Sequence, residues 1–221
     1  LDTKLIRPAF RNRINNIPQS ASCFAVYLKF KEGAMPYMNT NFYGYASQTP
    51  WNCENYTAES WPKGFLYMHM CSERNAKFAK SGVLISYMKM EDVAQWKEGK
   101  IGRRGAEYEE FKRRHAERLI AEVERFHPGL SAAIECYFTS TPLTYLDYTG
   151  TEDGSMYGVA KDITLGAGGR VPYRTKVPNL LLAGQNVNSH GMMGVIVGTI
   201  VTCSELVPAE EIYKQINEAI R

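Results

Sequence analysis

The sequence is short of long apolar runs, of cysteine pairs and of net charge. None of its apolar stretches approaches the roughly 20 residues that a membrane-spanning helix needs. Its five cysteines are odd in number, scattered and never spaced as C-x-x-C, which indicates a reducing compartment and no zinc or dithiol site. A net charge of +3 is too small to indicate a nucleic-acid partner. We therefore predict a cytoplasmic globular protein that binds no metal, with peripheral membrane association as the alternative.

A glycine-rich loop for a nucleotide phosphate is missing as well. The sequence has no G-x-G-x-x-G, and the nearest stretch, residues 166–171, lacks the final glycine and a strand before it. Such a loop holds the pyrophosphate of a dinucleotide at the start of a Rossmann fold. This sequence therefore lacks the usual beginning of a dinucleotide-binding domain.

The most informative stretch that is present runs from residue 177 to residue 203. Residues 179–183 form a short apolar run that is typical of a strand buried on both faces. Residues 184–186 then predict a turn, and Asn188 or Ser189 is expected to cap the helix that follows. Because apolar residues occupy most faces of that helix, we predict that it is buried almost all round.

One face of the predicted helix carries almost no side chains, because small residues recur at spacings of three and four: Gly191, Gly194, Gly198 and Thr202. Glycines weaken a helix, so another backbone or a flat ligand is expected to approach this face closely. We expect Gly194 to meet the ligand and Gly198 to pack so tightly that a methyl group overfills its site. The N–H groups at the helix start favour an anion or an electron-rich carbonyl there. From the pattern alone, a packed helix without a ligand is an equal alternative.

Two segments of this stretch resemble a flavin-binding signature. They are P-N-L-L-L-A-G-Q-N-V at 178–187 and H-G-M-M-G-V-I-V-G at 190–198. The pattern is similar to the C-terminal part of FAD-dependent oxidoreductases of the phytoene desaturase, carotenoid isomerase and retinol saturase group. T-P-L-T-Y-L-D-Y-T-G at 141–150 and G-S-M-Y-G at 154–158 extend the similarity upstream. Such proteins often carry an acidic residue at the turn, where this chain has glutamine and asparagine.

The resemblance implies a position for FAD. In that group the turn lies near the ribityl chain, and the helix start lies at the pyrimidine end of the flavin ring. The resemblance therefore assigns cofactor binding to seven residues: Gly184, Gln185, Asn186, Gly191, Met192, Met193 and Gly194. Aromatic residues of the preceding segment lie near the ring, so Tyr148 and Tyr157 are the candidate catalytic residues.

The rest of the sequence predicts an α+β fold. The predicted strands are rich in β-branched and aromatic residues and are bounded by turn residues: 22–30, 64–71, 82–90 and 131–140. Alternation along the second strand places Leu66, Met68 and Met70 on one face, which suits a flexible apolar pocket. Residues 105–126 have the spacing of one long helix, and 141–149 indicate a polar, aromatic loop. Residues 208–219 predict a last, amphipathic helix. The helix has a basic face that indicates contact with solvent or, as a minor alternative, with anionic lipid.

These patterns, taken with the resemblance, predict two domains. Residues 1–176 form a mixed-sheet substrate domain with one long helix and a return segment at 141–176. Residues 177–221 supply the C-terminal strand, turn and helix of a Rossmann-like FAD domain. Because the phosphate loop is missing, we expect the N-terminal FAD-binding part to be missing and the chain to be a fragment.

The resemblance also implies an activity. The whole protein would transfer hydride or electrons between FAD and a lipophilic substrate, such as a carotenoid-like or retinoid-like polyene. A flavin amine oxidase-like enzyme and a non-catalytic domain that binds an apolar ligand are the alternatives. We expect the chain alone to be inactive and to bind FAD weakly or not at all. We also expect its exposed apolar surface to favour a homodimer.

Overall fold

Two compact units make up the chain in this computed structural model, which describes residues 3–71, 73 and 75–220. The sheet unit comprises Ala21–Met156, and the terminal unit combines Leu1–Ser20 with Tyr157–Arg221.

The two halves of the terminal unit are joined by backbone pairing. The Ser20 N–H donates to Gly158 O, and the Ala160 N–H donates to Pro18 O, each at 2.7 Å. Residues 157–176 therefore lie in the same compact unit as the C-terminal segment. The compact units do not divide at residue 176, where the sequence places the domain boundary.

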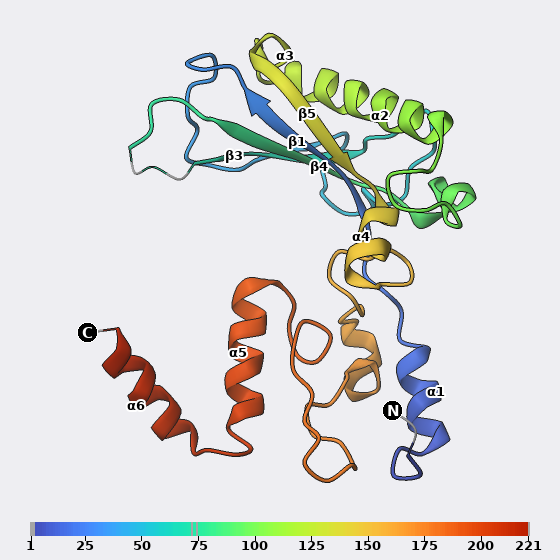
Figure 1. The fold of residues 1–221 in the computed structure, drawn as a ribbon, viewed down its shortest axis with the longest axis vertical. Coiled ribbons are helices and arrows are strands. Elements are labelled where there is room, and N and C mark those ends of the chain that lie inside the picture. Colours follow the sequence, from blue (N-terminus) through green and yellow to red (C-terminus); the bar gives the residue numbers. More distant parts are fainter. Residues whose placement is uncertain (1–2, 72, 74, 221) are drawn as a thin grey trace. The chain divides into compact units, whose positions relative to one another are not determined.

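The sheet unit contains a five-stranded sheet. Its strands are β1 (Cys23–Phe30), β2 (Phe42–Tyr45), β3 (Gly64–Met70), β4 (Ser81–Tyr87) and β5 (Ile134–Ser140). They lie in the order β2-β3-β4-β1-β5, and every pairing between these described strands is antiparallel (Figure 1). The prediction of a mixed sheet is therefore wrong. Residue periodicity shows which face of a strand is buried, but it does not show the direction of its neighbour.

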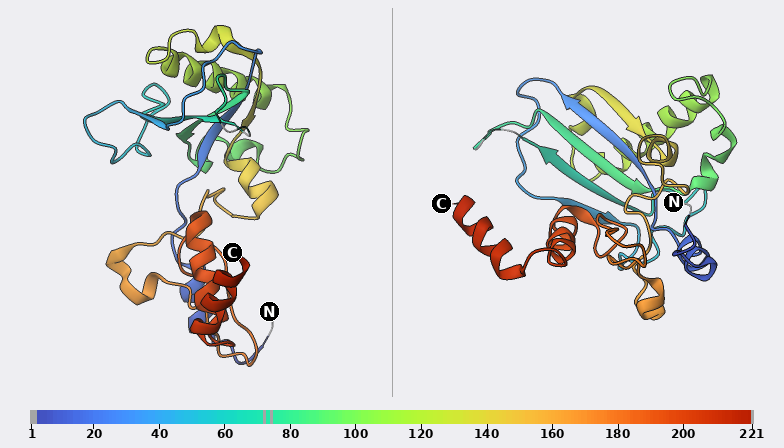
Figure 2. Two further views of the ribbon diagram at one scale, coloured as in Figure 1. Left: turned by 90° about the vertical axis from the view of Figure 1, so that its left-hand side faces the viewer. Right: turned by 60° about the horizontal axis from the view of Figure 1, so that its bottom comes forward.

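One long helix covers one face of the sheet. α2 (Ala106–Glu124) lies along one face of the sheet, as Figures 1 and 2 show. Its buried side chains share one core cluster with Phe24, Val26 and Leu84 of the strands. Its buried side chains recur at helical spacing: Tyr108, Phe111, Ala116, Leu119, Ile120 and Val123. The predicted helix over 105–126 is confirmed within two residues at each end.

The opposite face of the sheet is apolar and open. Pairing places Tyr27 of β1 between Val83 of β4 and Phe138 of β5. Phe138 is 70% exposed and Tyr27 is 42% exposed, so no described segment of the sheet unit covers this part of the sheet. β3 extends the same face with the three residues predicted to share it: Leu66, Met68 and Met70. Contiguous exposed apolar surface of this kind marks a binding surface.

Short helices connect the strands of the sheet unit. η1 (Met90–Asp92) and η2 (Ala94–Trp96) follow β4, and α3 (Leu130–Ala133) precedes β5. The strand predicted over 131–140 therefore begins three residues late, at Ile134.

Residues 142–149 form a helix, α4 (Pro142–Thr149), where the sequence analysis predicted a loop. The Thr141 hydroxyl accepts the Leu143 N–H at 3.2 Å, and the Thr144 hydroxyl accepts the Thr141 N–H at 3.1 Å. These reciprocal bonds satisfy N–H groups at the helix start, and Pro142 has the backbone angle that a first turn needs. The loop prediction overlooked this capping pattern.

The terminal unit has a small core. Its helical segments are α1 (Pro8–Asn15), η3 (Ile163–Gly169), α5 (Gly191–Cys203) and α6 (Ala209–Ala219). Its buried apolar side chains are Ile17, Val159, Val171 and Val187. The predicted C-terminal helix is confirmed as α6. None of the described helices of the chain is long and apolar enough to span a bilayer.

The strand predicted at 179–183 does not form. Leu181 makes a single bridge with Arg174, and the Leu182 N–H donates to Tyr173 O at 2.7 Å. A strand buried on both faces needs a neighbour along each edge. Among the described residues this segment has only the one bridge, so the Rossmann-like part of the predicted fold is not established.

α5 is also not buried all round. Gly198 and Thr202 are its buried residues, whereas Met192, Met193 and Ile196 are 82%, 72% and 51% exposed. The sequence identifies the apolar residues of a helix, but it does not show whether another element covers them. The prediction failed because no described segment packs on this side of α5.

Candidate functional site

The start of α5 carries no side-chain cap. Its N-cap residue is His190, not Asn188 or Ser189 as predicted, and no side chain accepts a hydrogen bond from its first turn. Gly191 has φ +78°, and a Cβ added there would meet no atom within 4 Å. The first N–H groups of an α-helix have no partner inside the helix, so this end offers donors and a positive dipole end.

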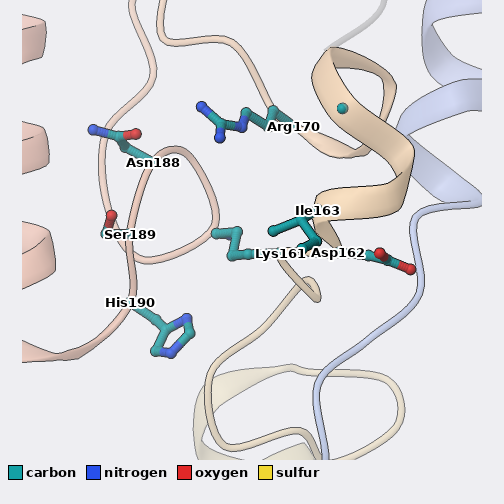
Figure 3. A pocket seen from close by; sticks show the side chains of 8 residues that line it. Lys161, Asp162, Ile163, Arg170, Asn188, Ser189 and His190 are labelled. Carbon is teal, nitrogen blue, oxygen red and sulfur yellow. The ribbon is translucent and has the colours of Figure 1, made fainter.

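A cavity of about 530 Å³ lies beside this helix start (Figure 3). It is lined by residues of two segments, one ending at the helix and one containing η3: Asn188, Ser189, His190, Lys161, Asp162, Ile163, Gly166 and Arg170. All of these residues belong to the terminal unit, so the cavity is complete within it.

Positive charge dominates the cavity. The Lys161 ammonium donates to Asn186 O at 3.0 Å and to Val159 O at 3.3 Å, and burial lowers its pKa. The Asp162 carboxylate is bound by Thr164, whose N–H and hydroxyl donate to its Oδ1 at 2.7 and 2.6 Å. In Figure 3 the Asp162 carboxylate points away from the other labelled side chains.

A side chain of α1 holds the backbone that carries Arg170, the second cation in the cavity wall. Arg13 Nη1 donates to Gly168 O and to Arg170 O, each at 2.9 Å, and so holds the backbone that carries Arg170. Lys161, Arg170 and the α5 N-terminus together favour an anionic or carbonyl-rich group.

The predicted turn residue Asn186 has a structural contact. Its Oδ1 accepts the Val159 N–H at 3.0 Å, and a side chain at Gly158 would overlap it. Asn186 therefore joins the turn to the segment that carries Lys161. Gly184 has φ +104°, which favours glycine, and Gln185 is half-buried beside it.

The glycines of α5 have different neighbours from those predicted. A Cβ at Gly194 would lie 2.7 Å from the Ser189 Cβ and 2.9 Å from its backbone carbon, so glycine is needed for the loop to fold back onto the helix. A Cβ at Gly198 would lie 3.5 Å from the Asn188 Cβ, which is ordinary contact. Within this chain Gly198 therefore has room for a methyl group, and its tight packing stays a prediction for the longer protein.

The two candidate catalytic tyrosines lie in different units. Tyr157 stacks on His190, with ring centroids 4.7 Å apart and an interplanar angle of 28°. The structure thus brings Tyr157 to the start of α5, while Tyr148 lies on α4 in the sheet unit and is 73% exposed. Sequence reasoning did not select His190, Lys161 or Arg170. Only the position of His190, directly before the first helical glycine, could have indicated its role.

Comparison with known proteins agrees with the group of oxidoreductases that the signature at 178–198 resembles. No protein-family model matches the chain. Its curated homologues are all-trans-retinol 13,14-reductases, or retinol saturases, which belong to the group that the C-terminal signature resembles.

These relatives match only part of the chain. The protein of Rattus norvegicus is 28% identical over 125 residues, which are 55% of this chain and 20% of the rat protein. The Homo sapiens protein is 28% identical over 130 residues, with the same coverage, and that of Danio rerio is 24% identical over 127 residues. The chain thus spans about a fifth of the length of the curated relatives that it matches.

Proposed function

We propose that this chain is the C-terminal part of an FAD-dependent oxidoreductase that acts on a retinoid-like polyene. The observation that carries the proposal is the cationic cavity at the uncapped start of α5, in the segment with the flavin-binding signature. The relatives are enzymes named for the reduction of all-trans-retinol, which supports this reaction class.

The cavity fits the pyrimidine end of a flavin, which bears carbonyl oxygens. The first-turn N–H groups of α5, the Lys161 ammonium and the Arg170 guanidinium would hold those oxygens. Gly191 leaves the approach open because it has no Cβ. Tyr157 and His190 would form a flat wall beside the ring, with Tyr148 as a further proposed ring-side residue. When bound, FAD would supply the hydride or electron chemistry.

The open face of the sheet is the proposed substrate surface. Its exposed aromatic and methionine side chains, among them Tyr27, Met70 and Phe138, suit a long apolar ligand. Contact with a membrane that stores such a substrate, and assembly into a homodimer, belong to the same proposal, because both would shield this apolar surface from water.

The cofactor site can be tested in the longer protein that contains this chain. We expect Lys161→Ala to weaken FAD binding about tenfold or more, because a charge-assisted hydrogen bond contributes about 1.5–3 kcal/mol. Lys176→Ala removes a lysine of the same unit that does not line the cavity, and serves as the control. Equal FAD affinity of the two variants would contradict the placement of the flavin.

The substrate surface needs a separate pair of variants. Phe138→Asp should lower kcat/KM for reduction of all-trans-retinol and leave the FAD content unchanged. Ile101→Asp is the matched control, since Ile101 is 53% exposed but lies outside the sheet. If Phe138→Asp binds an apolar ligand poorly and the parent protein shows no turnover at all, the non-catalytic alternative is supported instead.

A further inference from the structure

A second cavity, of about 500 Å³, lies within the sheet unit. The segment before β3, the helix η1 and the outer side of α2 enclose it with eight residues: Tyr56, Ala58, Trp61, Asp92, Phe111, Arg114, His115 and Arg118. Its volume falls within the range of about 300–1,000 Å³ that is usual for small-molecule sites. None of its residues takes part in the proposed flavin or substrate site.

Two arginines of α2 give the lining of this cavity a net positive charge, since Asp92 is the only carboxylate among the eight residues. Arg114 and Arg118 are four residues apart and therefore lie on the same side of the helix, where like charges repel. Glu110 is shared between two arginines: it binds Arg113 at 2.7 and 2.9 Å, and it lies farther from Arg114, at 4.0 Å. Arg118 is held in place by the backbone oxygens of Ala58 and Glu59.

The carboxylate in the cavity wall is already engaged. Asp92 accepts the hydroxyl hydrogen of Tyr56, whose oxygen in turn accepts the Lys89 N–H at 2.6 Å. Burial and the bond to Asp92 raise the pKa of Tyr56, so the phenol stays protonated and keeps this bond. Asp92 is therefore hydrogen-bonded to Tyr56, and the guanidinium groups of Arg114 and Arg118 keep donors for a second anion.

The floor of the cavity is aromatic. The His115 ring lies between Phe111 and Trp61, at centroid distances of 3.9 and 4.8 Å. Its Nδ1–H donates to Phe111 O at 2.8 Å, and burial lowers its pKa. A neutral imidazole therefore continues the flat apolar surface rather than adding a third cation.

We infer that this cavity binds a planar aromatic monocarboxylate. The carboxylate lies between the guanidinium groups of Arg114 and Arg118, where it removes their mutual repulsion. The ring lies on the aromatic floor at His115. A bare inorganic anion would fill only the cationic part, and a neutral aromatic compound would leave the two arginines uncompensated.

Isothermal titration calorimetry of the 221-residue chain with 2-naphthoate tests this inference. We expect saturable binding at one site, and binding at least tenfold weaker for 2-naphthamide, which has the same shape without the charge. Arg114→Gln should weaken naphthoate binding at least tenfold. Arg114 is 66% exposed, so its replacement should leave the fold intact, which a melting curve checks.

Arg125→Gln is the control, because Arg125 pairs with Glu122 and does not line the cavity. It should bind naphthoate within about twofold of the parent chain, which is less than half a kcal/mol. No binding of naphthoate, equal binding of the amide, or equal losses in the two arginine variants would overturn the inference.

Discussion

The ion pair between Arg104 and Asp147 should be a main support of the sheet unit. The guanidinium binds the carboxylate at two points, Nη1 to Oδ2 at 2.7 Å and Nη2 to Oδ1 at 2.8 Å. The two side chains are only 5% and 13% exposed. Asp147 lies on α4 next to Tyr148, so the pair also holds the helix that carries a candidate catalytic residue.

Asp147→Asn keeps the shape of this side chain and removes its charge. Breaking a buried ion pair from one side costs about 3–5 kcal/mol, since the other charge stays buried without a counter-ion. Arg104 would still donate to Trp96 O at 3.1 Å and lie over the Tyr108 ring. We therefore expect the lower end of this range, about 3 kcal/mol.

Urea unfolding followed by circular dichroism measures this loss. With a slope of about 2 kcal/mol per molar urea, the midpoint should fall by about 1.5 M. Glu110→Gln is the matched control, because Glu110 also binds an arginine at two points but is half exposed. Solvent screens such pairs, so its midpoint should hardly move. Equal shifts in the two variants would refute the argument from burial.

Three further outcomes are expected. The purified chain should be colourless, and a yellow preparation with stoichiometric flavin would contradict the proposed division of the FAD site. Gly194→Ala should destabilise the terminal unit by about 1–3 kcal/mol, because the added methyl group clashes with the loop at Ser189. Gly198→Ala should instead stabilise α5 by up to about 1 kcal/mol. Hydrogen exchange of the α5 amides distinguishes the two effects. Burial lowers the pKa of three histidines in the folded chain, so the unfolded chain binds protons at a higher pH than the folded chain does. The free energy of unfolding should therefore fall as pH drops below 6.5. Stability that is unchanged between pH 7 and pH 5 would contradict this role for His69, His115 and His127.

The sequence alone determined the longer strands of the sheet unit and the longer helices. The spacing of apolar residues gave α2 and α6, and alternation gave β3 with its two faces, because these periods follow from local backbone geometry. The resemblance to the group that includes retinol saturases also came from local sequence, and the curated relatives agree with it.

Only the tertiary structure decided what the signature segment contacts. Lys161 and Arg170 reach the start of α5 because Asn186 binds the segment that carries Lys161, and because Arg13 holds the backbone at Arg170. No spacing rule links residues this far apart. The antiparallel pairing of the sheet was decided in the same way, since it depends on partners that local periodicity does not encode. The missing strand at 179–183 has the same cause, because a buried strand forms only where its neighbours are present.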